Sequence, residues 1–559
     1  MTRYITHSTR SRRLTRFIAP LVVVVGLVGA GCGDSKSGSG VAQTTTTTLA
    51  GPSTTAAPQP KSGGSLTVGT FTETPSLDPV TNIGTGVTGG MELVALYDSL
   101  MTYDPTTGNF QPRTAASLTP NTDLTVWTLK LKPNIKFADG TAYDSAAVVF
   151  NLKRQIDLKG RSLGLVSNMK TFDTPDPLTV VITLNTPNST IPFVLASAPG
   201  MIASPAVIQA QGANFGTNPV NAGAGPFVFS SFKPKEAVVF KKNPNYWNGP
   251  VYLDELHFVN LIGQQANVDA LKNNTLQATL LRDPAAIAQA KDAGYTGLEA
   301  AQSAGNTIEI NNGVKIACTG GQPAAVCTGV ADGTLVATKT ITSDKRVRQA
   351  VAAAINLDTL NTRVYQGKAQ LDTSLFAKTS HWNSGIAGPK YDLEQAKTLV
   401  NQVKATGWDG SIRVSCHNGL PDWGIAVKTM LELAGFKVTL DDNKPVADNT
   451  AAVVTKKDFD LACFGTSILD EEPFSAIARE FTFSGYSNPV VDAAVKAGPV
   501  ATTDADKKKA LDTIATAYTA DVPFLSLSPA IQLIAVAKNV RGATQSVNSI
   551  VSFDKAWLS

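Results

Sequence analysis

The sequence predicts an α/β protein built on a parallel sheet, and three observations support this prediction. Between residues 411 and 465, strand and helix patterns alternate, which is typical of parallel strands joined by helices. An amphipathic helix is expected to begin near Asp344, because apolar residues recur on one of its faces. The chain has 559 residues, which is enough for two or three domains with sizeable cores.

Folded sequence is expected to begin near Ser65, where strands and helices mix. Apolar residues at alternate positions, bounded by turn residues, predict strands over 66–71, 126–131 and 178–184, and a hairpin over 227–232 and 237–241. Helical spacing predicts helices over 91–100 and 144–156, the second after the Asp139-Gly140 turn and with Asp144 as its N-cap.

In the alternating region, the apolar segments are short enough to be strands. They cover 412–415, 437–440 and 459–463. The intervening helical patterns cover 423–434, which Gly435 ends, and 447–456. In the usual order of such a unit, the first and third strands are neighbours in the sheet.

The N-terminus is typical of an export signal, which we place at residues 1–31. A basic stretch, Arg10–Arg16, precedes an apolar run, Phe17–Val28, shorter than the roughly 20 residues that cross a bilayer. The small residues before Cys32 are similar to a bacterial lipobox, although Gly29 stands where leucine is usual. The hypothesis is that Cys32 is lipidated. An ordinary cleaved signal is the alternative, and the export route, general or twin-arginine, stays open.

Residues 32–64 are predicted to be a disordered tether, because they are rich in Gly, Ser, Thr, Pro and Ala and lack core residues. The formal net charge is +4. The first 31 residues hold five arginines and no acid, so the rest of the chain carries 4 − 5 = −1. A nucleic-acid binder needs a basic face, so we expect no nucleic-acid partner.

Export changes what the remaining cysteines indicate, since disulfides persist outside the cytoplasm. Cys318, Cys327, Cys416 and Cys463 are even in number and form no C-x-x-C pair, which disfavours a zinc site. A Gly-Gly-x-Pro turn between Cys318 and Cys327 favours a small disulfide loop. The neighbouring first and third strands of the alternating region would place Cys416 beside Cys463, and whether these two are oxidised stays open.

Short motifs then follow one another along nearly the whole chain after residue 64. They are Thr74-Pro-Ser-Leu-Asp-Pro79, Glu92 to Leu100, Trp127 to Gly140, Gly223-Ala-Gly-Pro-Phe227, Asn243-Pro-Asn-Tyr-Trp247, Asp344-Lys-Arg-Val-Arg-Gln-Ala350, Gly485-Tyr-Ser-Asn-Pro489 and Asp521-Val-Pro-Phe524. In this order they resemble the peptide/nickel/opine solute-binding proteins of ABC importers, family 5. The motifs are mainly structural, so they identify a fold and leave the ligand open.

The resemblance implies a periplasmic-binding-protein-like fold of type II, with two α/β lobes, a hinge and an extra domain inserted in the first lobe. The first lobe would take 61–95, 220–310 and 505–559, the insert 96–219 and the second lobe 311–504. The implied function is extracytoplasmic: a monomeric receptor, anchored to the outer face of the cell membrane, captures a small solute and passes it to an ABC permease. An oligopeptide is the family default, and no cofactor or metal is expected.

The ligand is expected between the lobes, since open parallel sheets bind ligands beyond the carboxyl ends of their strands. The candidate residues follow such strand ends in both lobes: Glu73, Thr74, His417, Asn418, Phe464, Thr466, Ser467 and Asp470.

Peptide-binding relatives place an aspartate four residues before the proline that follows the third strand, and a tryptophan three residues before that aspartate. Here Leu469 and Thr466 occupy those positions, and Asp470 is one residue out of register with Pro473. A standard pocket for a peptide ammonium group is therefore in doubt. For His417, hydrogen bonding to an organic ligand, a structural role and a metal complex stay open, although a single histidine makes a poor metal site.

Two other functions are weighed. A secreted hydrolase would need a motif such as G-x-S-x-G or H-E-x-x-H, and the sequence has neither, nor a phosphate-binding G-K-[ST] loop. Only His257, His381 and His417 remain after the signal as catalytic bases, so we expect no enzyme and no catalytic residue. A sensory or scaffold lipoprotein on the same fold is the second alternative, which neighbouring permease and ATPase genes would disfavour.

Overall fold

One long mixed sheet organises the protein. The computed structural model describes residues 59–319, 325–417 and 421–559. The strands of the sheet, in spatial order, are β16 (Lys437–Lys444), β15 (Ser411–His417), β17 (Leu461–Gly465), β12 (Thr296–Ile310), β18 (Phe524–Val536), β11 (Ala278–Leu281), β1 (Ser65–Thr70), β10 (Glu255–Asn260), β9 (Ala237–Lys242) and β8 (Phe227–Lys233).

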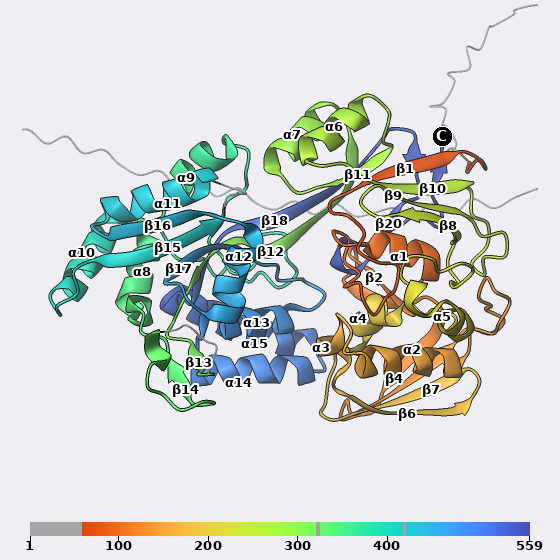
Figure 1. Cartoon of the computed structure of the whole chain (residues 1–559), viewed down its shortest axis with the longest axis horizontal. Coiled ribbons are helices and arrows are strands. Elements are labelled where there is room, and N and C mark those ends of the chain that lie inside the picture. The colour runs from red at the N-terminus through yellow and green to blue at the C-terminus, as the bar shows by residue number, and fades with distance from the viewer. Residues whose placement is uncertain (1–58, 320–324, 418–420) are drawn as a thin grey trace, which may run out of the picture. The chain divides into compact units, whose positions relative to one another are not determined.

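Strands β12 and β18 run between two groups of elements, which we call the first and second lobes (Figure 1). They pair antiparallel over two stretches, and the register shifts between Gln302 and Thr307. A Cβ atom on Gly305 would lie 2.2 Å from the backbone nitrogen of Ala530, so only glycine fits where the two strands approach. In the bulge, Ser303 pairs instead with Ile468, after β17.

The first lobe contains the strands β1, β8, β9, β10 and β11. It also contains the helices α1 (Gly90–Tyr97), α6 (Gln264–Lys272) and α7 (Pro284–Asp292). Helix α1 ends three residues earlier than the sequence predicts. Asp98 has a positive φ of 60°, which a right-handed helix cannot continue. Short C-terminal strands complete the lobe: β19 (Val540–Arg541), β20 (Thr544–Gln545), β21 (Val551–Ser552) and β22 (Trp557–Leu558).

A second sheet lies within the segment expected as an insert. Its strands are β4 (Ala115–Pro120), β5 (Val126–Leu131), β7 (Thr179–Leu184) and β6 (Met169–Asp176), next to the small hairpin of β2 (Met101–Asp104) and β3 (Asn109–Pro112). The predicted N-cap is confirmed, since the Asp144 carboxylate accepts a hydrogen bond from the Ala147 nitrogen at 2.9 Å at the start of α2 (Ser145–Asp157). The other helices here are α3 (Leu163–Val166), α4 (Ile191–Ala196) and α5 (Pro205–Gln211).

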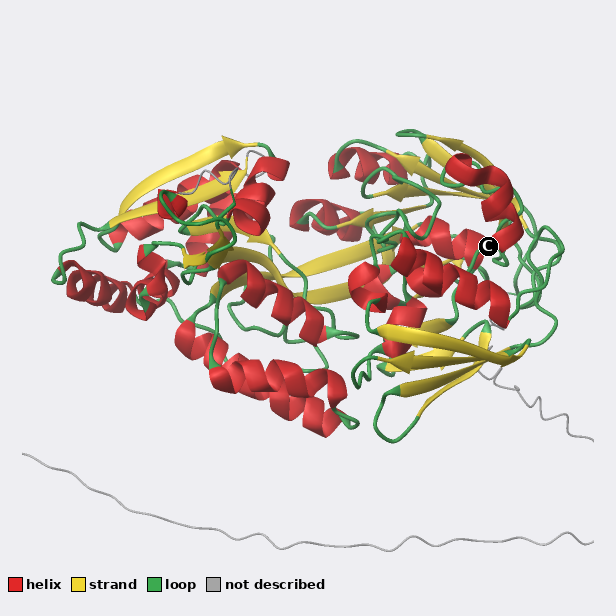
Figure 2. Cartoon of the chain, turned by 60° about the horizontal axis from the view of Figure 1, so that its bottom comes forward, coloured by secondary structure: helices red, strands yellow, loops and turns green. Residues whose placement is uncertain are grey.

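The second lobe contains the predicted alternation. Strand β15 lies between β16 and β17 and is parallel to both, which confirms that the first and third strands are neighbours. The helices of this lobe are α8 (Lys345–Ala354), α9 (Leu357–Tyr365), α10 (Leu393–Lys404), α11 (Pro421–Leu433), α12 (Val446–Ala451), α13 (Pro473–Ser484), α14 (Pro489–Ala497) and α15 (Asp504–Asp521). Figure 2 shows these helices in red on either side of the yellow strands.

Packing assigns α15 differently from the expectation, which placed residues 505–559 in the first lobe. Its apolar residues, among them Leu511, Ile514 and Tyr518, are buried with Phe474 and Ile477 of α13 in the second lobe. The chain therefore returns to the first lobe along β18 and not near residue 504. The other lobe and insert boundaries stay predictions.

Both candidate cysteine pairs are joined in the structure. Cys318 and Cys327, with Cα atoms 5.4 Å apart, close the end of the hairpin of β13 (Lys315–Ala317) and β14 (Leu335–Ala337). Cys416 and Cys463 link the ends of β15 and β17, with Cα atoms 4.7 Å apart. In the part of the chain that the structure describes, no helix has the length and apolar character needed to cross a membrane.

Candidate ligand-binding site

A pocket of about 660 Å³ lies beside β12 and β18, the two strands that run between the lobes. Its floor is formed by Gly305 and Asn306 of β12 and by residues 528–531 of β18. Its walls come from both lobes: Phe71, Gln264, Arg282, Asp283, Ile287 and Lys291 from the first, and Tyr365, Lys368, Thr466, Ser467 and Arg479 from the second. The volume suits a small organic molecule.

The pocket residues sit beyond strand carboxyl ends, as the general rule for open α/β sheets requires. Phe71 follows β1, Arg282 follows β11, and Thr466 follows β17 directly. The segment after β17 is hydrogen-bonded to β12, because the Thr466 nitrogen donates to the Gly305 carbonyl at 2.8 Å. Backbone geometry therefore sets the position of this wall.

The wall of the second lobe is a network of hydrogen bonds. The Thr466 hydroxyl donates to the buried carboxylate of Glu480, and the Arg479 Nε donates to the same carboxylate at 3.3 Å. The Asn306 amide donates to the Tyr365 hydroxyl at 3.0 Å. Burial is the largest cause that raises the pKa of Tyr365, to about 12, so this hydroxyl keeps its proton at neutral pH.

The wall of the first lobe is set by Gln264. Its side-chain oxygen accepts hydrogen bonds from the backbone nitrogens of Arg282, at 2.5 Å, and of Asp283, at 2.7 Å. The Asp283 carboxylate caps α7 by accepting from the Ala286 nitrogen at 2.8 Å. The guanidinium carbon of Arg282 lies 5.5 Å from the centroid of the Phe71 ring, an arrangement typical of a cation–π contact.

Of the predicted ligand residues, the structure brings Thr466 and Ser467 into this pocket. It places Glu73 and Thr74 elsewhere, beside a separate space of about 10 Å³. Thr74 is buried and its hydroxyl donates to the Glu92 carboxylate at 2.5 Å, which gives it a partner within the first lobe. Glu73 is exposed on the adjoining loop.

Asp470 is held by its own lobe. Its carboxylate accepts from the Ser380 hydroxyl at 2.5 Å and from the His381 nitrogen at 2.8 Å, and its carbonyl accepts from the Trp382 ring nitrogen at 2.7 Å. Burial raises the pKa of Asp470. These contacts explain the residue as an anchor for the 380–382 loop, so it is not a residue of the pocket described here.

Two further predicted residues, Phe464 and His417, belong to strands of the second lobe and do not line the pocket. Phe464 packs its ring edge-on against Phe483, with centroids 6.1 Å apart, and does not line the pocket. His417 ends β15, where burial lowers the pKa of its imidazole. Asn418 and Cys32 lie outside the described residues.

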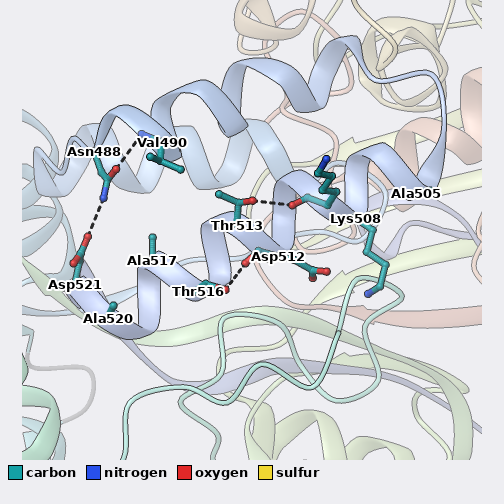
Figure 3. Close-up of a pocket in the computed structure, with 11 residues that line it drawn as sticks. Asn488, Val490, Ala505, Lys508, Asp512, Thr513, Thr516, Ala517, Ala520 and Asp521 are labelled. Atoms are coloured by element: carbon teal, nitrogen blue, oxygen red, sulfur yellow. Dashed lines mark hydrogen bonds between the residues drawn. The ribbon is translucent and has the colours of Figure 1, made fainter.

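A wider groove of about 820 Å³ runs along α15 (Figure 3). Its lining comes from α15 and the start of α14, both in the second lobe. Its polar groups partly satisfy one another, for example Asn488, whose amide donates to the Asp521 carboxylate at 3.1 Å. A ligand here would contact one lobe only, so the pocket beside β12 and β18 is the better candidate.

Sequence reasoning missed Phe71, Arg282, Tyr365, Lys368 and Arg479. For Arg282 a signal was present, because the strand 278–281 ends just before it and Asp283-Pro284 is a helix start. Applying the carboxyl-end rule to this strand would have found the residue. Nothing comparable marks Tyr365, the last residue of α9, or Lys368, which comes three residues later.

In the described ranges 59–319, 325–417 and 421–559, no group of three or more His, Cys, Asp or Glu side chains is placed to hold a metal ion.

Comparison with known proteins decides the family. The model of the bacterial extracellular solute-binding proteins, family 5 (middle part), matches residues 109–487. The chain belongs to this family. Family 5 proteins are extracytoplasmic solute-binding proteins and not enzymes.

A curated relative of this family 5 protein is the glutathione-binding protein GsiB of Pectobacterium atrosepticum. It is 26% identical over 458 residues, which cover 78% of this chain and 84% of the relative.

Among solved structures, the fold is similar to that of the oligopeptide-binding protein AppA of Bacillus subtilis, solved in complex with a nonapeptide. The TM-score is 0.70 at 18% identity, over 90% of this chain and all of AppA. NikA of Brucella suis, solved in complex with Fe(III)-EDTA, gives a TM-score of 0.71 at 18% identity, over 89% of this chain and 100% of NikA. These two structures show the type II binding-protein fold, and their different ligands show that the fold alone does not fix the solute.

Proposed function

We propose that this protein is the lipid-anchored receptor of an ABC importer, which closes around a small solute in the pocket beside β12 and β18 and delivers it to a permease. The observation that carries the proposal is the composition of the pocket: its walls come from both lobes, and its floor is the pair of strands that connects them. Contacts on both sides are what allow a solute to favour the closed state.

The physical argument is one of linked equilibria. A ligand shifts a conformational equilibrium only by its different affinities for the two states. Phe71 and Arg282 move with the first lobe, whereas Tyr365 and Ser467 move with the second, so a solute contacts both sets only when the lobes are close together. If 1% of the free protein were closed, the apparent affinity would be about 100-fold weaker than the affinity of the closed state.

The solute class is argued from the relatives. GsiB carries the name of a glutathione-binding protein, and AppA was solved with a peptide. We therefore propose a peptide or a peptide-like small molecule as the solute. The residues proposed to contact it are Thr466 and Ser467, which were expected from the sequence, together with the first-lobe residues Phe71 and Arg282.

The first test identifies the solute and measures closure. Native mass spectrometry of the purified protein is expected to show a co-purified small molecule. After its removal by unfolding and refolding, adding it back should lower the radius of gyration in small-angle scattering. The control is a second small molecule of the same charge that does not raise the melting temperature of the protein. It should leave the radius of gyration unchanged. A protein that binds no small solute, or binds one without compaction, would contradict the closure mechanism.

A further inference from the structure

The charges that line the pocket are unbalanced. Four cationic side chains face one carboxylate there: Arg282, Lys291, Lys368 and Arg479 against Asp283. Lys291 is paired with Glu299 at 2.5 Å, and Arg479 with Glu480 at 3.3 Å. The one pocket carboxylate, Asp283, caps α7. Arg282 and Lys368 are therefore left with positive charge that these groups do not neutralise.

Arg282 differs from every other arginine that the described structure buries fully or in part. Each of the other four has oxygen acceptors for its guanidinium. Three of them pair with carboxylates: Arg113 with Asp98 and Asp554, Arg154 with Asp78, and Arg346 with Asp344. The fourth, Arg348, donates to the backbone carbonyls of Thr342, Ser343 and Asp521. Within residues 59–319, 325–417 and 421–559, the Arg282 guanidinium makes no ion pair or hydrogen bond.

A half-buried charge without acceptors is costly, so its retention points to an acceptor that arrives from outside the chain. Burial alone lowers the pKa of Arg282, in agreement with the lack of a neighbouring acid. The guanidinium is also pre-oriented, because Gln264 fixes the backbone of Arg282 and the Phe71 ring lies against its face. A planar fork held in this way suits an oxyanion that accepts two parallel hydrogen bonds.

We infer that the solute carries an anionic group, a carboxylate or a phosphate, which binds the Arg282 guanidinium, while its apolar part rests on Phe71 and Ile287. This inference rests on the proposed solute-binding function and narrows its substrate class. The charge is opposite to that of the ammonium group which an aspartate meets in peptide-binding relatives, a contact that the sequence already puts in doubt. Asp470 is occupied within its own lobe, and Glu73 lies outside the pocket.

The test compares anionic probes with uncharged partners on refolded, solute-free protein. The probes are glutathione and the dipeptide Met-Leu, their matched ester and amide, and inorganic phosphate. Calorimetry should show that the carboxylate probes bind more tightly than the ester and amide. Arg282→Gln should weaken binding of the carboxylates by about 10- to 100-fold, the loss typical of a charge-assisted hydrogen bond. Arg282→Lys, which keeps the charge without the fork, should lie between the two.

The control variant is Arg161→Gln, which removes an exposed arginine outside the pocket and should bind as the wild type does. Binding of phosphate but of no carboxylate would assign the anion to a phosphate. Equal binding of the carboxylate probes by wild type and Arg282→Gln, or equal binding of a carboxylate probe and its ester and amide by wild type, would overturn the inference and leave the proposed function intact. Failure of every probe, together with no co-purified solute, would count against both.

Melting temperatures separate a binding role from a structural one. Because the Arg282 charge lacks an acceptor in the solute-free chain, Arg282→Gln should melt at the same or a higher temperature without solute. A lower melting temperature without solute would show that the guanidinium supports the fold, and would overturn the inference.

Discussion

Two carboxyl groups, Glu309 and Glu480, are fully buried behind the second-lobe wall of the pocket. Among the described residues, neither oxygen of Glu309 has a hydrogen-bond partner. Burial first, and the charge of Glu480 second, raise the pKa of Glu309 well above its ordinary value of 4.5, while Lys457 opposes the shift. Burial likewise raises the pKa of Glu480, against the hydrogen bond from Thr466. Both carboxyls therefore bind a proton more tightly in the folded chain than in the unfolded chain.

This pair predicts a particular pH dependence of stability. A carboxyl whose pKa is higher in the folded chain binds its proton more tightly there, so the free energy of unfolding falls as pH rises above 4.5 toward the folded pKa. Each pH unit in that window costs about 1.4 kcal/mol per group. Glu309→Gln removes this loss, so in urea unfolding the variant should gain stability relative to wild type as the pH rises above 4.5.

The matched control is Glu394→Gln, which replaces an exposed carboxylate paired with Lys397. Its stability relative to wild type should change little across the same pH range. If Glu309→Gln and Glu394→Gln showed the same pH profile, Glu309 would be ionised in the folded protein, contrary to the prediction.

At the residue scale, sequence reasoning can predict which residues follow a strand end, and it cannot predict which groups they bond to. The carboxyl-end rule placed Thr466 and Ser467 at the pocket because strand order fixes where a strand ends. The same rule could not show that Asp470 accepts two hydrogen bonds from the 380–382 loop, since that loop lies about ninety residues earlier in the chain. Contacts of this kind depend on packing that no local pattern encodes.

At the scale of elements, the hairpin β13–β14 carries a prediction. Cys318 is bonded to Cys327 at its end, and the Cys318 nitrogen also donates to the Thr334 carbonyl at 2.9 Å. Replacing both cysteines by serine should lower the free energy of unfolding by about 2–3 kcal/mol, because the short loop no longer restricts the unfolded chain. Urea unfolding measures the loss.

Non-reducing peptide mapping is the independent check on this hairpin. It should recover Cys318 and Cys327 in one cross-linked fragment. Free thiols at both positions in the exported protein would refute the disulfide, whatever the stability of the double variant.

The strands and helices that the sequence could predict are those in which apolar residues recur at one regular spacing. The strands and helices of the alternating region were found because each follows one pattern between turn residues, and β15 has the neighbours predicted for it. Strands β12 and β18 were not found. Their register shifts midway, where Gly305 and Pro529 interrupt the pattern, so each mixes two faces of the sheet and loses its alternation.

At the scale of the whole molecule, the proposed anchor makes a further prediction. Cys32→Ala should remove the acylated residue, so the protein should move from the detergent phase to the aqueous phase in Triton X-114 partitioning and appear in the medium. Ser35→Ala, in the same predicted tether, is the control and should stay with the membrane. A wild-type mature protein that starts at another residue and carries no lipid would contradict the anchor.

The resemblance implied two lobes, and one of the boundaries that it implied differs from the packing. Residues 505–521 were expected in the first lobe, yet α15 buries its apolar face on α13 in the second. A helix at the end of a discontinuous domain has no sequence signal for which lobe it joins, because either core could cover the same apolar stripe. Only the packing of Leu511, Ile514 and Tyr518 decides it.

The position of Gly305 has a consequence for how specificity can change. Under the proposed closure, β12 and β18 serve both as the bending element and as the floor that touches the solute. A substitution at Gly305 or Ala530 would alter both the stiffness of the β12–β18 connection and the shape of the pocket floor. The rate of opening and the affinity for the solute would therefore change together. Substitutions on the walls, at Phe71 or Ser467, leave the connection untouched. Relatives that share this geometry are therefore free to acquire new solutes through their walls while keeping the same mechanical response.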